Sequence, residues 1–324
     1  MLACVQGVVL PEPRPQFPPP SSISAEAQAV LAVSGGFALQ PHPALDDIAG
    51  WERWVEASDG PLTKMLGGYQ LSDDVMRRTE FEIDGVTTHV LHPVGVPDDA
   101  PVVVELHGGG LILCGGELSW KITAARAAER QAITWVPDYR MPPHHRFPVA
   151  LDDCLAVYRR ALAERDPSRI AVSGASAGGN LAAALMLRAK DDGLPLPAAL
   201  ILMTPELDLT ESGDTFATLL GIDQLGLLAA VNELYADGQD LTHPYLSPLF
   251  GDVTGFPPTF LQSGTRDLYL SNTVRMHRKL LDAGVPVELR VMEAGLHGGF
   301  GGRTPEDRVI NADMLAFLAE HLAD

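Results

Sequence analysis

Short apolar runs alternate with amphipathic stretches along most of the chain from about residue 77 onward. Eight of these runs are predicted strands, because each is short, rich in branched residues and bounded by turn-forming residues. They are Thr79–Ile83, Thr87–His92, Val102–Leu106, Ala132–Val136, Arg169–Ser173, Ala198–Met203, Pro258–Gln262 and Val287–Met292. Several are apolar throughout, which is typical of strands that are covered on both faces of a sheet.

Helical periodicity separates the later strands. Helices are predicted near residues 117–130, 148–165, 176–192 and 271–283, and a last helix is predicted to begin at Thr304. Strands that alternate with helices in this way form a mostly parallel sheet with helices on both faces. The predicted fold class is therefore α/β, with an eight-stranded sheet.

Two segments stand outside this alternation. Residues 1–75 begin with a proline-rich arm at 11–20, and helices are predicted there at Ala25–Val33 and Ala44–Ala57. Residues 206–251 lie between two predicted sheet strands and are too long for a simple connection, which is typical of lids and binding elements. We therefore predict an N-terminal segment, 1–75, and a catalytic domain, 76–324, that carries the insert 206–251.

Composition limits the classes of partner. The chain has 324 residues and a formal charge of −19, and an acidic surface repels phosphate backbones and anionic lipids. We therefore expect that the protein does not bind nucleic acid and has no membrane-spanning segment. Its three cysteines, Cys4, Cys114 and Cys154, form no CxxC pair, and the first residues lack the basic stretch of a signal peptide. These features predict a soluble, cytoplasmic protein.

The most specific motif is the run Gly174-Ala175-Ser176-Ala177-Gly178, which has the form G-x-S-x-G. It follows a predicted strand and precedes a predicted helix, the context in which this motif presents a nucleophilic serine on a sharp turn. A phosphate-binding glycine turn is the alternative, but that turn requires glycine at the position of Ser176. We therefore assign Ser176 as the candidate nucleophile.

A second glycine-rich turn, His107-Gly108-Gly109-Gly110, follows the predicted strand Val102–Leu106. Consecutive glycines allow backbone N–H groups to approach a substrate oxygen without interference from Cβ atoms. Alone, the run is equally consistent with an ordinary turn. Next to a nucleophilic serine it predicts an oxyanion hole, the set of amides that stabilises the developing negative charge.

A serine nucleophile needs a general base and an acid that orients it, and after G-x-S-x-G these follow in the order acid, then histidine. His297 lies in a glycine-rich loop just past the last predicted strand, whereas the other downstream histidines lie in predicted helices or in the insert. Those others are His243, His277 and His321. We assign His297 as the base.

Three carboxylates compete for the role of the acid. Asp267 follows the predicted strand Pro258–Gln262, which places it at the same edge of the sheet as Ser176 and His297. Asp208 comes one strand earlier, and Glu293 ends the last strand. We assign Asp267 and keep Asp208 as the second choice.

These motifs resemble those of the hormone-sensitive-lipase family of α/β-hydrolases, which includes microbial carboxylesterases and lactone hydrolases. Two further segments carry the likeness. Residues 138–153, DYRMPPHHRFPVALDD, are similar to that family's D-Y-R-L-A-P-E-H-x-F-P segment, and residues 204–209, TPELDL, are similar to its S-P-x-x-D-L stretch. The resemblance covers about residues 77 to 324 and implies an α/β-hydrolase fold with a helical cap.

The resemblance also assigns roles to residues. It implies a catalytic triad of Ser176, Asp267 and His297, and an oxyanion hole formed by the amides of Gly109, Gly110 and Ala177. Supporting rather than catalytic roles are implied for three further residues, His107, Tyr139 and Arg140. Residues 1–75 and 206–251 would form the cap that covers the site.

The implied activity is that of a serine carboxylesterase acting on short- to medium-chain acyl esters through an acyl-enzyme, with no cofactor and no metal. A lactone or amide hydrolase with the same triad is the alternative, and a noncatalytic receptor on this fold is disfavoured because Asp267 and His297 are both retained. Members of the family often pair through the last strand, so a homodimer through Val287–Met292 is a further hypothesis.

The chain departs from the family pattern at a few positions. Ala175 stands where many relatives carry aspartate or threonine, His144 replaces a usual glutamate, and Glu206 stands where an aromatic residue is frequent. The adjacent pair His144 and His145 is a weak metal-ligand set, because no cysteine lies nearby. Cys114 follows the glycine turn closely and is expected near the pocket as an inert thiol.

Overall fold

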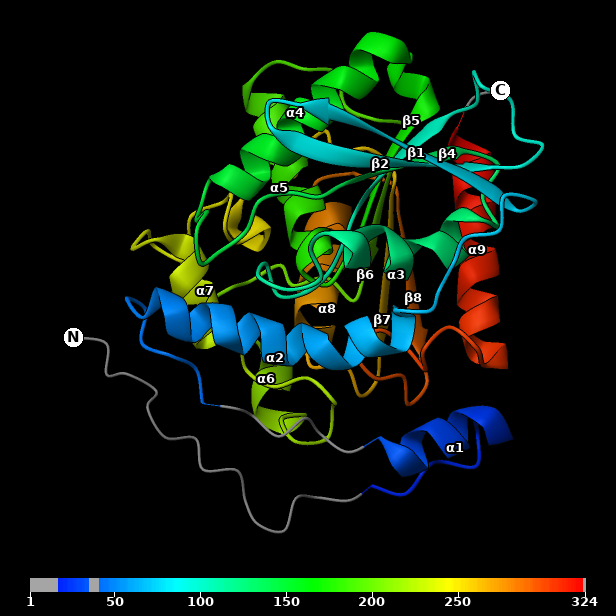
Figure 1. Ribbon diagram of the computed structural model, residues 1–324. Coiled ribbons are helices and arrows are strands. Elements are labelled where there is room, and N and C mark those ends of the chain that lie inside the picture. Colours follow the sequence, from blue (N-terminus) through cyan, green and yellow to red (C-terminus); the bar gives the residue numbers. More distant parts are fainter. Residues whose placement is uncertain (1–16, 35–40, 323–324) are drawn as a thin grey trace.

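The computed structural model describes residues 17–34 and 41–322. Its centre is one eight-stranded sheet with the strand order β1-β2-β4-β3-β5-β6-β7-β8. The pairs β1–β2 and β2–β4 are antiparallel, and every other neighbouring pair is parallel. The sheet twists through the middle of the molecule, between helices on both faces (Figure 1). This architecture confirms the predicted fold class.

All eight predicted strands are present, with ends that differ from the prediction by a few residues. They are β1 (Met76–Ile83), β2 (Val86–Pro93), β3 (Val102–Leu106), β4 (Ile133–Pro137), β5 (Ile170–Ala175), β6 (Ala199–Met203), β7 (Thr259–Gly264) and β8 (Val287–Met292). The side chains of β3, β4 and β7 are buried throughout. This burial agrees with the continuous apolar runs from which the central strands were predicted.

Helices cover the sheet from two sides. The bounds are α3 (Glu117–Ala127), α4 (Val149–Glu164), η1 (Pro167–Arg169), α5 (Ala177–Asp191), α8 (Leu270–Asp282) and α9 (Pro305–His321). The largest core cluster packs α4, α5 and α8 against one face, with Leu181 and Leu200 at its centre. On the other face, α9 packs Phe317 against Phe260, and α3 packs Trp120 against Leu91.

The N-terminal helices are α1 (Ala25–Val33), as predicted, and α2 (Ile48–Leu66). The predicted bounds of the second helix, Ala44–Ala57, were wrong at both ends. Its start is delayed because the Asp47 side chain accepts the N–H of Gly50 at 2.8 Å and so caps the helix. At the other end the helix continues through Pro61, although proline removes a backbone donor. The predicted proline-rich arm, 11–20, lies mostly outside the described residues.

The insert 206–251 contains α6 (Asp214–Thr218), α7 (Ala229–Ala236) and the short turn η2 (Pro248–Phe250). Figure 1 shows α2 running across one edge of the sheet, with α6 and α7 at the same edge. Trp51 of α2 packs with Val231 and Leu234 of α7 and with Ile112, which follows the glycine turn. We call α1, α2 and residues 206–251 the cap. The domain division at residue 75 stays a prediction.

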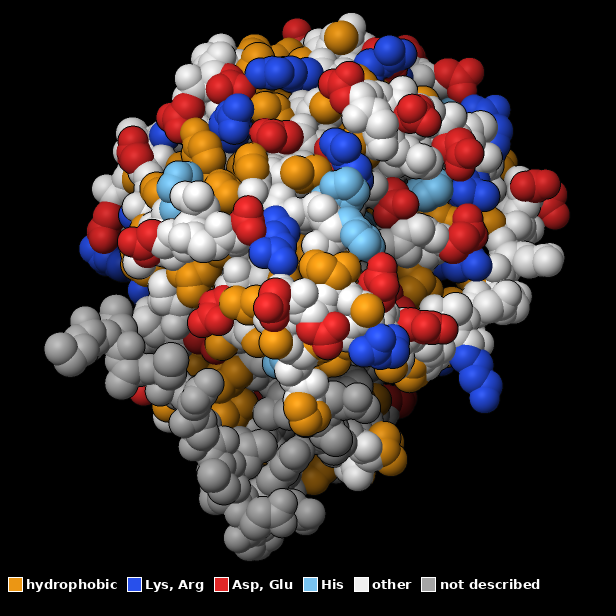
Figure 2. Space-filling model, turned by 60° about the vertical axis from the view of Figure 1, so that its left-hand side comes forward, with side chains coloured by type: hydrophobic (Ala, Val, Ile, Leu, Met, Phe, Trp, Pro, Cys, Tyr) orange, Lys and Arg blue, Asp and Glu red, His pale blue; other side chains and the backbone are white. Residues whose placement is uncertain are grey.

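The surface carries both signs of charge. On the face shown in Figure 2, Lys and Arg side chains are scattered among Asp and Glu rather than gathered into one patch. Among the described residues, no helix is both long and apolar enough to cross a membrane. A cytoplasmic location stays a prediction.

Candidate active site

Ser176 stands on the sharp turn between β5 and α5. Its backbone has φ 56° and ψ −123°, a sparsely populated conformation that costs about 1–3 kcal/mol. The flanking glycines make the turn sterically feasible, because a Cβ on Gly174 would lie 2.1 Å from the carbonyl oxygen of Gly178. A Cβ on Gly178 would lie 2.0 Å from the carbonyl oxygen of Leu106. The glycines of the motif are therefore required by close backbone contacts.

The glycine-rich turn lies directly against Ser176. A Cβ on Gly108 would be 3.3 Å from the Cβ of Ser176, so the two segments are in contact. Gly109 and Gly110 have φ values of +127° and +61°, which L side chains rarely adopt. The structure therefore places the predicted oxyanion residues beside the predicted nucleophile.

His107, the first residue of this turn, is fixed by contacts with Tyr139. Its ring is buried and stacks on Tyr139 with centroids 4.1 Å apart, and the Tyr139 hydroxyl donates to the His107 carbonyl oxygen at 2.6 Å. Burial lowers the pKa of His107, so the ring is held neutral. Arg140 in turn binds Asp153 through its backbone N–H and its guanidinium. The contacts between Tyr139 and His107 are those of residues that hold the glycine turn in place.

Asp267, which is buried, and His297, which is half-buried, form a pair at the carboxyl edge of the sheet. Asp267 Oδ1 lies 3.1 Å from His297 Nδ1 and also accepts the N–H of Tyr269 at 3.0 Å. Asp267 Oδ2 accepts the hydroxyl of Ser263 at 2.6 Å. The Tyr269 ring meets the imidazole edge-on, with centroids 5.0 Å apart. The carboxylate is therefore well placed to orient the imidazole through Nδ1 and leave Nε2 for a reacting group.

The hydroxyl of Ser176 forms no hydrogen bond with His297 in the described part of the chain. The carboxyl ends of the parallel strands β5, β7 and β8 nevertheless bring Ser176, Asp267 and His297 to the same edge of the sheet. In enzymes of this type such a bond is often long and tightens only in the complex with substrate.

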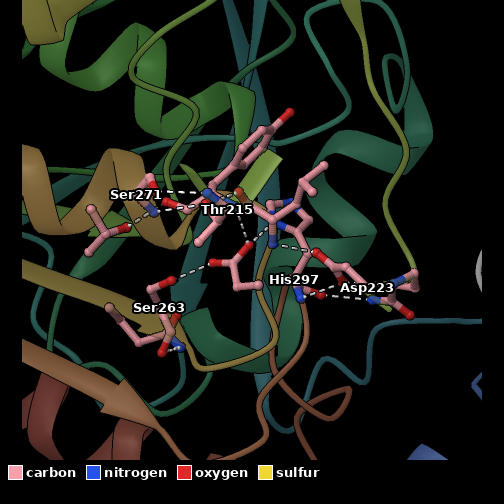
Figure 3. A network of polar contacts seen from close by, with 11 residues as sticks. Thr215, Asp223, Ser263, Ser271 and His297 are labelled. Atoms are coloured by element: carbon pink, nitrogen blue, oxygen red, sulfur yellow. Dashed lines mark hydrogen bonds and ion pairs between the residues drawn. The ribbon is translucent and has the colours of Figure 1, made fainter. Parts of the chain in front are cut away.

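The sequence analysis missed Asp223, a buried cap residue that contacts the loops of both Asp267 and His297. Its Oδ1 accepts the backbone N–H of His297 at 3.0 Å, and its Oδ2 accepts the N–H of Leu268 at 2.7 Å. The neighbouring Gln224 donates its amide to the carbonyl oxygen of His297 at 2.7 Å. Figure 3 shows Asp223 and His297 joined in this way. No local motif marks Asp223, because its partners lie 45 and 74 residues away.

The electrostatics of His297 result from opposing effects. Burial of the ring lowers its pKa, but the hydrogen bond and charge of Asp267 raise it, and so do the charges of Asp223 and Glu206. The carboxylates outweigh burial, so the pKa of His297 lies above its ordinary value of 6.5. Negative charge around the ring therefore stabilises the imidazolium that a general base becomes.

Asp223, Asp267 and His297 also satisfy the distance requirement for a metal site, with ligand atoms within 4.8 Å of one another. Backbone amides already bind both oxygens of Asp223, and Asp267 already faces Nδ1 of His297. The donors around these carboxylates therefore fit an oriented base better than a cation. His144 of the predicted weak set contacts Glu52 at 3.0 Å instead.

The competing candidates have other partners. Asp208 forms an ion pair with Arg275 at 2.7 Å, and Glu293 is exposed. His243 packs against the aromatic rings of Phe147 and Tyr245. Of the remaining histidines, His277 is half-buried within α8, and His321 bonds through Nδ1 with a carbonyl oxygen of its own helix, α9.

The cap meets the glycine turn at two points. The Leu228 side chain lies 3.2 Å from the position that a Cβ on Gly110 would occupy. Both carboxylate oxygens of Asp59 lie 3.1 Å from the N–H of Cys114. Burial and the nearby Asp59 raise the pKa of the Cys114 thiol to about 12, which makes it unreactive.

The sequence and the fold both match known hydrolases. A family model described as an alpha/beta hydrolase fold matches residues 103–300. The carboxylesterase NlhH of Mycobacterium tuberculosis is 35% identical over 235 residues, which cover 66% of this chain and 72% of the relative. An esterase of Acinetobacter venetianus is 31% identical over 67% of this chain and 74% of its own length.

The chain belongs to the α/β-hydrolase family. Among solved structures, the esterase E25 is similar with a TM-score of 0.82 at 34% identity, covering 95% of this chain and 97% of that chain. An esterase from the bacterial hormone-sensitive lipase family is similar with a TM-score of 0.79 at 29% identity, covering 93% and 99%. These findings confirm the predicted hormone-sensitive-lipase type and the predicted enzyme class, a carboxylic ester hydrolase.

Proposed function

We propose that this hydrolase is a serine carboxylesterase that cleaves short- to medium-chain acyl esters through an acyl-enzyme. The observation that carries the proposal is the hydrogen bond between the buried Asp267 and His297, at the edge of the sheet where Ser176 stands on its turn. The activities of the similar esterases agree with it.

Each step then uses a group of this chain. His297 takes the proton of the Ser176 hydroxyl as its oxygen attacks the ester carbonyl, and Asp267 stabilises the imidazolium. The amides of Gly109, Gly110 and Ala177 bind the oxyanion. Ala177 begins α5, where backbone N–H groups are free of intrahelical partners.

Collapse of the tetrahedral intermediate breaks the ester bond, and His297 gives its proton to the departing alkoxide. Water then attacks the acyl-enzyme, with His297 taking its proton. The acid is released, the proton returns to Ser176, and the enzyme is regenerated.

The test compares the wild type with Ser176→Ala on p-nitrophenyl esters from acetyl to dodecanoyl. We expect the wild type to favour the shorter chains and the variant to lose nearly all turnover, since loss of the serine nucleophile in subtilisin costs about 10⁶ in kcat. Ser168→Ala is the matched control, because Ser168 is exposed and its side chain bonds, within the part of the chain that the structure describes, only with Asp166. Turnover by Ser176→Ala equal to that of the wild type would contradict the mechanism.

We also propose that two copies pair through β8. This strand bonds only with β7 among the described strands, and Val291 on it is exposed. An open strand edge is a template for pairing with another chain. Size-exclusion chromatography with light scattering should show a dimer, and a single species near the chain mass of 34.7 kDa would refute the pairing.

A further inference from the structure

Glu206 occupies an unusual position for a carboxylate. It follows β6 on the segment that carries the sequence TPELDL, and its backbone N–H donates to the carbonyl oxygen of Ser176 at 3.2 Å. Its side chain is fully buried. A charged group removed from water in this way is normally paired or hydrogen-bonded.

Among the described residues, the carboxyl group of Glu206 has no ion-pair partner and no hydrogen bond of ordinary length. Neither of its oxygens accepts a hydrogen bond from the residues that the structure describes. The hydroxyl of Tyr269 and the side-chain amide N–H of Asn232 are the donors near the carboxyl, and both lower its pKa against the larger effect of burial. Neither forms a hydrogen bond of ordinary length with it. Tyr269 borders His297, and Asn232 belongs to the cap helix α7. A carboxyl group without a hydrogen bond of ordinary length therefore lies between His297 and the cap helix α7.

The carboxylates around Glu206 also outnumber the positively charged groups that could pair with them. Asp208 is neutralised by Arg275, but Glu206 and Glu211 form no ion pair with Lys or Arg among the described residues. Burial raises the pKa of Glu206 and of Glu211 to about 7 each. The positive charge that acts on Glu206 is that of His297, which Asp267 and Asp223 already compensate. Above about pH 7, where Glu206 and Glu211 are ionised, the site therefore has a surplus of negative charge, which a cationic hydrogen-bond donor would neutralise.

We propose that Glu206 determines substrate specificity by binding a protonated amine on the acyl chain or on the alcohol of an ester held at Ser176. The inference rests on the proposed function, since it requires Ser176 to be the nucleophile. A bound water molecule would also satisfy the carboxyl, but it would give no preference for charged esters. Substrate preference therefore separates the two.

The experiment measures hydrolysis of matched pairs of esters by titrating the released acid at about pH 8. At this pH a carboxyl group with a pKa of about 7 is ionised, and aliphatic amines stay protonated. β-Alanine ethyl ester against ethyl butanoate tests a charge on the acyl side. 3-(Dimethylamino)propyl acetate, whose protonated amine carries an N–H donor, against 4-methylpentyl acetate tests a charge on the alcohol side.

The wild type should have the higher kcat/KM for the charged ester in one of the two pairs. In Glu206→Gln the charged-to-neutral ratio for that pair should fall about tenfold or more, as expected for loss of a charge-assisted hydrogen bond. Glu206→Met, which removes the unsatisfied oxygens, should lower the ratio at least as far. Should the Gln variant fail to fold, the Met variant decides the result.

Glu211→Gln is the matched control. It also removes one buried carboxylate, but Glu211 Oε1 already accepts the N–H of Leu228 at 2.6 Å, and an amide oxygen can keep that bond. An equal fall of the charged-to-neutral ratio in Glu206→Gln and Glu211→Gln would refute direct binding of the amine by Glu206. It would indicate instead that the general negative potential of the site attracts the charged ester. A ratio unchanged in Glu206→Gln, or no wild-type preference in either pair, would also overturn the inference. Hydrolysis that persists in Ser176→Ala would refute the proposed function instead.

Discussion

Replacing Asp223 with asparagine should change the pH dependence of hydrolysis. The substitution removes one negative charge next to His297 and keeps one oxygen that can accept the N–H of His297. The other catalytic and charged groups that face the imidazole, Asp267 and Glu206, are unchanged, as is the edge-on ring of Tyr269. The variant therefore isolates the charge that the cap contributes.

The size of the effect follows from the geometry. The closest side-chain atoms of Asp223 and His297 lie within 4.8 Å. Two unit charges at about 5 Å interact by about 0.8 kcal/mol in water and about 3.3 kcal/mol at an effective dielectric constant of 20. These energies correspond to about 0.6 and 2.4 pKa units. We expect a shift near the lower end of this range, about one unit, because the backbone amides around Asp223 already delocalise part of its charge.

The sign is fixed by the role of the base. His297 must be neutral to accept a proton, so the acid limb of kcat/KM against pH reports its pKa in the free enzyme. Asp223 raises that pKa, and its removal should move the acid limb to lower pH by about one unit. Plateau activity should fall about tenfold, because the imidazolium formed in the reaction loses the same stabilisation.

The assay is hydrolysis of p-nitrophenyl butanoate between about pH 5 and 9, with product measured after the pH has been readjusted. Asp240→Asn is the control, because Asp240 is an exposed carboxylate of the same insert that caps the turn at Thr242. A fall in plateau activity without a shift of the acid limb would refute the electrostatic argument and leave Asp223 a purely structural role. A shift to higher pH would refute the sign.

Two further predictions concern the supports of the site. Glu105→Ala should lower the free energy of unfolding by about 3–5 kcal/mol in urea denaturation, because it leaves the buried guanidinium of Arg130 unpaired. Two arginines hold the pKa of Glu105 at about 2 against the opposing effect of burial, so the stability that Glu105 contributes should be present above about pH 4.5 and lost as the pH falls toward 2. Asp59→Ala should lower kcat more than it raises KM, because it removes the acceptor for the Cys114 N–H just past the oxyanion turn. Asp59→Asn, which keeps an acceptor, should restore most of kcat, and equal losses in both variants would contradict this role.

The sequence predicted those parts of the fold and site that have local signals. The eight strands follow from apolar runs whose side chains are buried in the sheet, as in β3 and β6. Ser176 and Gly109 belong to glycine motifs. Their glycines are needed because the backbone passes very close to residues a few positions away in the sequence or on the neighbouring strand. The contact between Asp267 and His297 was expected because parallel strands end at one edge, which brings loops together whatever their distance in sequence.

The missed features depend on contacts that leave no pattern along the chain. The second helix was expected to end at Ala57, before a glycine and a proline, but Asp59 within its next turn contacts a loop 55 residues away. Asp223 lies in a stretch without regular periodicity and binds backbone groups. Glu206 was noted only as a departure from an aromatic position, since the absence of hydrogen-bond partners is visible only once the side chains around it are placed.

Three acidic residues of the cap make the same kind of contact. Asp59, Glu211 and Asp223 each accept backbone N–H groups, at the end of the oxyanion turn, at Leu228 above Gly110, and at the loop of the base. Because the donor in each contact is a backbone N–H, the contact requires an acceptor side chain in the cap. It does not require a particular residue type at the position that donates. An acidic cap can therefore hold the catalytic loops in register and at the same time add negative charge around the imidazole. If amides or hydroxyls took the place of the carboxylates, the hydrogen bonds could remain but the negative charge around the imidazole would be lost. The pH profile of hydrolysis, rather than the stability of the protein, therefore distinguishes a charged cap from one that only packs well.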